Sequence, residues 1–325
     1  MAQPPAMTGR TSPLARTPSL AQLATEQLGV VSRAQLRELG ISRHHVRSQL
    51  VAERWQAWSG RVIALMTGPV TYEQRLVAGL LHAGPGAKLD DLTALEALGL
   101  RNWETEDVHV LVEHGLKVPA VEGLVIHHSR RVPDDDVTTA LGHPSVSAAR
   151  AGIDAASAMR SERRATGLLV ALVRDRLTTA ADILECLAGL EKVRHTAAFR
   201  AALVYADEGA ESVSEIDIGR LLRRAGLTDF RRQVPVMTSL GLRRFDVVVT
   251  LPDGSLLNVE VDGPHHLEPE QRSIDAAKDA AAAALGMAVM HVPSDDVQRR
   301  SYEIVARFVT IRKAAEARSG SRIAL

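Results

Sequence analysis

Residues 243–251, RRFDVVVTL, and residues 255–266, SLLNVEVDGPHH, decide the fold of the C-terminal part of the chain. Both stretches are rich in valine and leucine over a length typical of strands. The intervening Pro252-Asp253-Gly254 is a turn signal, so the two stretches are predicted to form an antiparallel hairpin. Pairing about residue 253 makes Asp246 and Glu260 cross-strand neighbours.

The hairpin is predicted to separate acidic from apolar side chains. Because side chains alternate along a strand, Glu260 and Asp262 share one face, and the other face carries valines 247, 249, 259 and 261. The carboxylates of Asp246, Glu260 and Asp262 then converge. Such a cluster raises its own pKa values unless solvent or a divalent cation screens it. An all-oxygen donor set suits Mg²⁺ or Mn²⁺.

The elements around the hairpin follow an α-β-β-β-α-β order. A helix begins at Ser214-Glu215 and ends at Gly226, as capping and glycine signals indicate. The pattern then predicts strands over residues 232–236, 244–251, 256–262 and 287–292. A further helix, over residues 268–285, is expected between the last two strands.

The spacing of Asp246, Glu260 and Asp262 on a hairpin resembles the core of the PD-(D/E)XK nucleases. The string VEVDGPHH, residues 259–266, resembles the branch that is similar to very short patch repair endonucleases. In this resemblance Glu215 matches the acidic residue of the first helix. Further matches follow the motif: Arg272, Asp275, Lys278 and Asp279 in the next helix, and residues 286–289 in the strand after it.

The resemblance implies metal-dependent hydrolysis of DNA phosphodiesters. Asp246 and Glu260 would be the principal ligands of Mg²⁺ or Mn²⁺, and Asp262 an additional ligand or a water-orienting group. Most of the superfamily carries a lysine where Asp262 stands, so activation of water must come from elsewhere. His265 or His266 is a candidate general base, with His266 preferred, and water on the metal could also ionise without a base. The alternative is that the histidines are surface turn residues and the acids an inactive site.

The N-terminal segment predicts three helices and a hairpin. Capping patterns begin helices at Ser19, Ser32 and Ser42, and the first two end at Gly29 and Gly40. Residues 54–57 and 61–65 flank Trp58-Ser59-Gly60 and form the predicted hairpin. This combination predicts a winged helix-turn-helix domain.

The third helix of this segment is basic. With Val46 and Leu50 facing the core, the N-terminal end that would enter a major groove is left exposed. Residues 30–61 carry six arginines against Glu38 and Glu53. The candidate DNA contacts are Arg33, Arg43, His44, Arg47 and Arg61. The alternative is that these arginines only solvate helix faces.

The segment from Leu20 to about Met159 resembles the AbiEi-type antitoxins, in which a winged helix is followed by a supporting domain. The match continues weakly through residues 123–130 and 144–154. It implies repression of the protein's own promoter, and a toxin protein is a further candidate partner. Short strands at residues 108–112 and 124–127 and a helical pattern over residues 145–205 are expected here. His127-His128 makes no metal site on its own, because adjacent strand residues point to opposite faces.

Length and composition limit the classes of protein to which this chain can belong. A chain of 325 residues corresponds to about two domains, and equal totals of 39 cationic and 39 acidic side chains restrict a nucleic-acid surface to a local patch. The single cysteine, Cys186, excludes disulfide frameworks and fits a reducing cytoplasm. No apolar run reaches the length of a membrane span. Gly84-Pro85-Gly86 lacks the pattern of a dinucleotide loop, so no organic cofactor is expected.

Together these features predict an α+β, multidomain protein. The expected parts are a disordered tail (residues 1–18), a winged helix-turn-helix domain (19–68), a small AbiEi-like α/β middle domain (69–160), a helical linker (161–210) and a restriction-endonuclease-like core (211–318). The expected function is that of a cytoplasmic, DNA-binding, Mg²⁺-dependent endodeoxyribonuclease. The alternative is a non-catalytic antitoxin or transcriptional regulator with an inactive nuclease fold.

Overall fold

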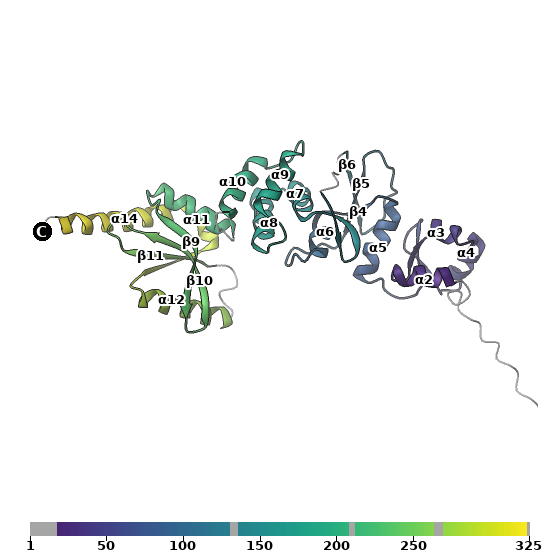
Figure 1. The fold of residues 1–325 in the computed structure, drawn as a ribbon, viewed down its shortest axis with the longest axis horizontal. Coiled ribbons are helices and arrows are strands. Elements are labelled where there is room, and N and C mark those ends of the chain that lie inside the picture. Colours follow the sequence, from purple (N-terminus) through teal and green to yellow (C-terminus); the bar gives the residue numbers. More distant parts are fainter. Residues whose placement is uncertain (1–17, 131–135, 208–211, 263–268, 324–325) are drawn as a thin grey trace, which may run out of the picture. The chain divides into compact units, whose positions relative to one another are not determined.

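The computed structural model describes residues 18–130, 136–207, 212–262 and 269–323. Within these ranges the chain is a mixed α+β protein with three sheets (Figure 1). It divides into two compact units, Met1–Asp154 and Ala155–Leu325. The fold class expected from the sequence is therefore confirmed at this level. The predicted N-terminal tail lies outside the described residues, apart from its last residue.

The first unit begins with three helices and a small antiparallel sheet of order β1-β3-β2. The elements are α2 (Pro18–Glu26), β1 (Val30–Ser32), α3 (Arg33–Glu38), α4 (Arg43–Val51), β2 (Gln56–Ala57) and β3 (Val62–Ala64). Two predicted helix starts are confirmed: Ser32 forms a capping box with Gln35, and the Ser42 hydroxyl accepts from the His45 amide. The predicted hairpin forms as β2 and β3.

A five-stranded sheet of order β6-β5-β4-β8-β7 completes the first unit. Its elements are α5 (Tyr72–Ala83), β4 (Lys88–Leu89), α6 (Asp91–Ala97), β5 (Val108–Glu113), β6 (Leu124–Ser129), β7 (Val137–Ala140) and β8 (His143–Val146). The two strands expected from the sequence, β5 and β6, form a parallel pair. A Cβ at Gly79 would lie 3.0 Å from Val108, so the glycine allows α5 to approach this sheet closely.

The second unit starts with helices and contains a four-stranded sheet of order β12-β11-β10-β9, which two further helices follow. Helix α7 (Ala148–Ala158) crosses the boundary between the units and is followed by α8 (Glu162–Arg174), α9 (Ala180–Ala188) and α10 (Thr196–Asp207). Then come α11 (Val213–Arg224), β9 (Phe230–Thr238), β10 (Gly241–Thr250), β11 (Leu256–Asp262), α12 (Pro269–Ala284), β12 (Ala288–Pro293), α13 (Ser294–Arg299) and α14 (Ser301–Ile323). The predicted α-β-β-β-α-β order is confirmed.

The predicted register of the hairpin is also confirmed. Val247 pairs with Val259 and Val249 with Leu257 in the antiparallel β10–β11 ladder. In this register the next two residues that lie opposite each other are Asp246 and Glu260. The β9–β10 ladder is interrupted at the same place: pairs form on either side of Asp246, and its opposite residue, Gln233, has a φ of 51°. Asp246 therefore lies at a local irregularity in the sheet.

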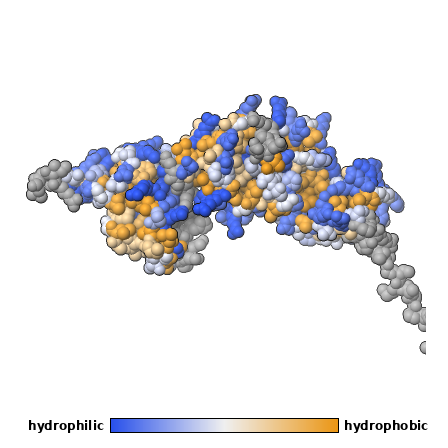
Figure 2. All heavy atoms as spheres, viewed as in Figure 1, coloured by the Kyte–Doolittle hydropathy of each residue, from blue (hydrophilic) through white to orange (hydrophobic). Residues whose placement is uncertain are grey.

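Helices cover both faces of this sheet. Val247 and Val259 pack in one cluster with Leu222 of α11 and Phe308 of α14. On the other face Phe245 and Val248 pack with Ala282 of α12. Small alanine side chains let α12 lie close to the strands, and its outward face is also largely apolar (Figure 2). The acidic face of the hairpin thus lies beneath α12.

Candidate functional site

Asp246, Glu260 and Lys278 come together between the hairpin and α12. The Lys278 ammonium contacts the Glu260 carboxylate and lies 3.4 Å from Asp246 Oδ1. The remaining carboxylate oxygens are also held: the Val261 amide donates to Asp246 Oδ2 at 2.8 Å, and Asn258 Nδ2 donates to Glu260 Oε1 at 2.9 Å. Two carboxylates from adjacent strands and one ammonium from a helix are therefore fixed in one cluster.

The charges of this cluster are strongly coupled. Burial and the neighbouring Asp246 raise the pKa of Glu260, while Lys278 and Asn258 partly oppose that rise. Burial by itself would lower the pKa of Lys278, but the carboxylates of Asp246 and Glu260 outweigh it, so the pKa lies above its ordinary value. Lys278 is consequently an ammonium ion at neutral pH and supplies the counter-charge of the two acids.

This arrangement corrects one expectation from the sequence. The acids were expected to need solvent or a divalent cation to relieve their repulsion, yet Lys278 already neutralises them in part. In the sequence, Lys278 is only one of several matches in the helix that follows the motif. It is distant in sequence from Asp246 and Glu260, so no local pattern predicts that it contacts both of them.

Asp262 belongs to a second cluster. His291 of β12 lies with Nδ1 3.0 Å from Asp262 Oδ1 and Nε2 3.1 Å from Asp279 Oδ1. Burial by itself would lower the pKa of His291, but the two carboxylates outweigh it and raise the pKa. Among the described residues, Asp246, Glu260 and Asp262 do not form a set of ligand atoms within 4.8 Å of one another. The predicted convergence of all three on one cation is therefore wrong in this structure, because β12 brings a basic partner to Asp262.

Glu215 contacts the sheet at Gln233, the residue of β9 that lies opposite Asp246. Its helix, α11, packs through Ile218 and Leu222 on the valine face of the sheet. The buried Glu215 side chain interacts with the Ser212 hydroxyl at 3.0 Å and accepts from Gln233 Nε2 at 3.0 Å. The prediction that Glu215 joins the acidic site requires α11 to cover the carboxylate face of the sheet. In the structure α11 covers the valine face, because its apolar side chains pack there.

His265 and His266, the candidate general bases, lie outside the described residues. Their proposed role stays a prediction. The assignment of Asp246 and Glu260 as metal ligands is likewise a prediction.

The basic helix α4 presents the side chains expected from the sequence. Arg43, His44 and Arg47 are exposed, and Val46 is buried in the core beneath them. These three side chains lie on the N-terminal half of α4, where the Ser42 cap holds the first turn. The predicted outward orientation is confirmed, and it leaves the cations available to an anionic partner.

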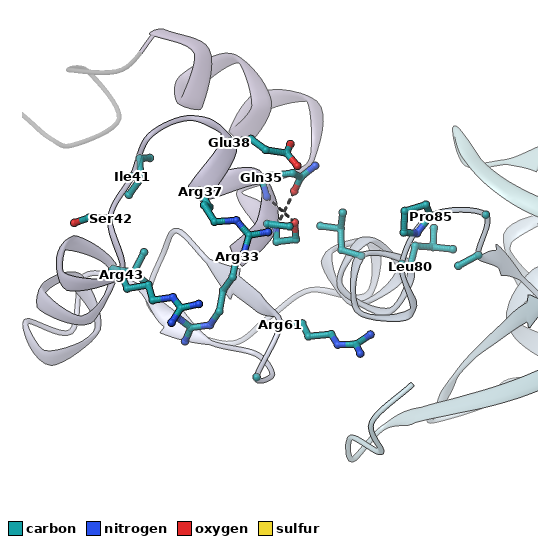
Figure 3. Close-up of a pocket in the computed structure, with 18 of the residues that line it drawn as sticks. Arg33, Gln35, Arg37, Glu38, Ile41, Ser42, Arg43, Arg61, Leu80 and Pro85 are labelled. Atoms are coloured by element: carbon teal, nitrogen blue, oxygen red, sulfur yellow. Dashed lines mark hydrogen bonds between the residues drawn. The ribbon is translucent and has the colours of Figure 1, made fainter. Parts of the chain in front are cut away.

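Arg33 and Arg61 have different surroundings. Both line a cavity of about 1070 Å³ in the first unit, together with Arg37, Arg43 and residues 84–87. Figure 3 shows Arg33 and Arg43 extending to the same side of this cavity, and Arg61 extending toward the helix that carries Leu80. Arg61 donates to the His82 carbonyl at 3.1 Å and to the Lys117 carbonyl at 3.5 Å. Its guanidinium is thus engaged by backbone acceptors.

A separate group in the first unit could hold a metal ion. It consists of Asp91, His109 and His127, whose ligand atoms all lie within 4.8 Å of one another. Burial lowers the pKa of His109, with Asp91 opposing the change. In the sequence His127 stands beside His128, and no local pattern links it to His109. The two histidines meet through the pairing of β5 with β6, which neither residue signals.

Comparison with known proteins indicates no function for this chain. No protein-family model matches the chain, and no curated protein matches it. Among the described helices, none has both the length and the apolar composition needed to cross a membrane.

Proposed function

We propose that this protein binds DNA and hydrolyses its phosphodiester bonds in a reaction that depends on Mg²⁺ or Mn²⁺. The observation that carries the proposal is the cluster of Asp246, Glu260 and Lys278. An Asp, a Glu and a Lys are the side chains of the PD-(D/E)XK motif that the hairpin resembles. In this chain the lysine comes from α12 rather than from the position of Asp262.

The topology of the second unit supports a restriction-endonuclease-like core. Its four strands form a sheet with β11 and β12 parallel and β9, β10 and β11 antiparallel. Helix α11 covers one face and α12 the other. The acids lie on β10 and β11, next to the interruption of the β9–β10 ladder, where side chains can depart from strict alternation.

The donor set fits a small divalent cation. Mg²⁺ is bound in many enzymes by one or two carboxylates, with water and substrate phosphate completing the shell. Asp246 and Glu260 supply two carboxylates from adjacent strands, so the turning of Asp262 toward His291 does not remove the site. A bound Mg²⁺ or Mn²⁺ would act as a Lewis acid and stabilise the charge that develops on the phosphate.

Lys278 would act as a cation and not as a base. In the metal-free protein the carboxylates of Asp246 and Glu260 raise the pKa of Lys278, so its amine is an ammonium ion at neutral pH. The ammonium would instead orient the two carboxylates and attract a phosphate oxygen. In this role Lys278 replaces the lysine that the hairpin string lacks, and proton removal falls to His266 or to another group.

A winged helix would deliver the DNA. The order of three helices with a β1-β3-β2 sheet supports this fold for residues 19–68. Arg43, His44 and Arg47 would contact the duplex from α4, since they are exposed on one helix. Arg33 would add a nearby cation, and Arg61 would chiefly fasten the hairpin to α5. Two weak DNA-binding modules on one chain strengthen each other through effective concentration.

A second candidate function is a non-catalytic antitoxin or transcriptional regulator. The same Lys278 contact favours it, because an ammonium that neutralises the two acids in part relieves their repulsion without a metal. The winged helix would then bind an operator, and a toxin protein would be a partner. In this case the second unit would keep the nuclease fold without its activity.

Cleavage assays separate the two functions. Supercoiled plasmid and single-stranded DNA would be incubated with the full chain and Mn²⁺ or Mg²⁺. We expect nicking by the wild type and its loss in Glu260→Gln, while Glu303→Gln, a change of an exposed glutamate on α14, remains active. DNA binding without metal-dependent nicking in any of the three proteins would leave the regulator as the function.

A further inference from the structure

We propose that Asp91, His109 and His127 form a binding site for a divalent transition-metal ion of the zinc class. The site lies in the first unit and uses none of the residues assigned to DNA hydrolysis. It combines two imidazole nitrogens with one carboxylate oxygen, a donor set that favours zinc over magnesium.

The spacing of the three donor atoms matches a metal site. His109 Nδ1 lies 2.9 Å from His127 Nε2, and Asp91 Oδ2 lies 3.9 Å from each of these nitrogens. A circle through these three atoms has a radius of about 2.1 Å. Zinc–nitrogen and zinc–oxygen bonds are about 2.0–2.2 Å long. A single cation could therefore reach all three donors without moving them.

A hydrogen bond joins the two histidines to each other but does not join either of them to Asp91. The separation of 3.9 Å between Asp91 Oδ2 and either histidine is too long for a hydrogen bond. The two imidazole rings are stacked with their centroids 5.2 Å apart, and both direct a nitrogen toward the same carboxylate oxygen. His109 and His127 are hydrogen-bonded to each other in the metal-free protein, and a bound cation would take the place of the proton between them.

The surroundings orient the Asp91 and His109 donors toward the site. The Leu92 amide donates to Asp91 Oδ1 at 2.6 Å, which leaves Oδ2 directed at the histidines. Thr105 Oγ1 lies 3.3 Å from His109 Nε2 and itself donates to the Asp107 carbonyl. The threonine oxygen can therefore accept only from Nε2–H, and this places the lone pair of His109 on Nδ1.

Three elements build the site. His109 lies on β5 and His127 on the parallel neighbour β6, while Asp91 is the first residue of α6 and has a φ of 53°. Such a backbone conformation is strained for a residue other than glycine, and strain of this kind is common at functional sites. The side chains of His109 and His127 are 17% and 28% exposed, so an ion can enter from solvent. Three protein ligands leave a coordination position for water or a small anion.

Cobalt titration tests the site directly. Untagged full-length protein would be treated with a chelator, dialysed and titrated with Co²⁺, whose visible absorption reports coordination by nitrogen ligands. We expect the visible absorption of the nitrogen-ligated ion to saturate at one Co²⁺ per chain and to be lost when Zn²⁺ displaces it, whereas an oxygen-ligated ion at Asp246 and Glu260 would absorb only weakly. His109→Gln and His127→Gln should each weaken Co²⁺ binding by at least ~100-fold. Replacing a residue that only hydrogen-bonds to a metal ligand costs no more than about 100-fold in affinity, so a loss of this size indicates a ligand.

His128→Gln is the matched control. His128 is the next residue on β6, is exposed and alternates to the other face of the strand, so its replacement should leave Co²⁺ binding unchanged. Asp91→Asn, which keeps the size of the side chain, should weaken binding even if a histidine variant does not fold. Absence of the Co²⁺ signal in the wild type, or equal loss in His128→Gln and His127→Gln, would overturn the site. Nicking of DNA in Mg²⁺ is expected to be the same in His127→Gln and wild type.

Discussion

The Lys278 ammonium on α12 contacts the Glu260 carboxylate on β11; Glu260 is buried and Lys278 is partly buried. Their side-chain exposures are 12% and 7%. A buried ion pair contributes little net stability compared with apolar residues, but loss of one partner leaves an uncompensated charge in the interior. The same two side chains therefore affect both the stability of the second unit and the proposed hydrolysis of DNA.

Breaking this pair should be costly. We expect Lys278→Met to lower the free energy of unfolding by about 3 kcal/mol, because Glu260 and Asp246 then lose their common counter-charge. Urea denaturation measures the effect. The double variant Lys278→Met/Glu260→Gln should recover part of the loss, as the coupling of two contacting residues requires.

An exposed ion pair provides the control for that experiment. Arg299 and Asp295 are 79% and 80% exposed, and Arg299→Ala should change the free energy of unfolding by less than about 1 kcal/mol. If Lys278→Met is as mild as Arg299→Ala, then the Lys278–Glu260 contact does not stabilise the folded protein.

Removal of Lys278 should also change the response to metal. The ammonium and a divalent cation compete for the same carboxylates, so Lys278→Met is expected to show a larger rise in melting temperature with Mn²⁺ than the wild type. Glu260→Gln should show a smaller rise. Each change would be made in the His127→Gln background, so that the site in the first unit does not contribute to the measurement.

The Lys278→Met variant should also differ from the wild type in DNA cleavage. If Lys278 positions the phosphate, then Lys278→Met loses nicking although it binds Mn²⁺ more tightly. Melting temperatures that do not respond to Mn²⁺ in any of these proteins would argue against a metal at Asp246 and Glu260.

The pKa of His291 predicts a pH dependence of stability. Because Asp262 and Asp279 raise this pKa in the folded protein above its ordinary value of 6.5, the stabilisation is fully present below that value. It is lost as the pH rises through the folded-state pKa. We expect the difference in unfolding free energy between wild type and His291→Gln to be larger near about pH 6 than near about pH 9. A difference that grows with pH would show that the charged His291 is not the stabilising form.

The arginines of α4 should determine the salt dependence of DNA binding. Each phosphate contact contributes about 0.9 to the slope of log affinity against log salt concentration. The Arg43→Ala/Arg47→Ala variant should therefore bind more weakly and with a slope reduced by up to about 1.8, measured by fluorescence anisotropy. Arg200→Ala, a change of an exposed arginine on α10, is the control. A slope that does not change would assign DNA binding to another surface.

Local rules were enough to predict several parts of this protein. The turn at residues 252–254 determined the register that places Asp246 beside Glu260. Capping signals located the starts of α3 and α4, and helical periodicity predicted which α4 side chains are exposed. These features depend on interactions between residues close together in the chain or joined by one tight turn.

The composition of each polar cluster was decided by tertiary structure. Lys278 reaches Asp246 and Glu260 because α12 packs on the acidic face, and His291 reaches Asp262 because β12 adds beside β11. His109 meets His127 through the pairing of β5 with β6. Alternation within a strand tells which residues share a face, but not which helix or neighbouring strand will cover it. That choice depends on the packing of apolar surfaces distant in sequence, and it determined the charged partners of Asp246, Glu260 and Asp262.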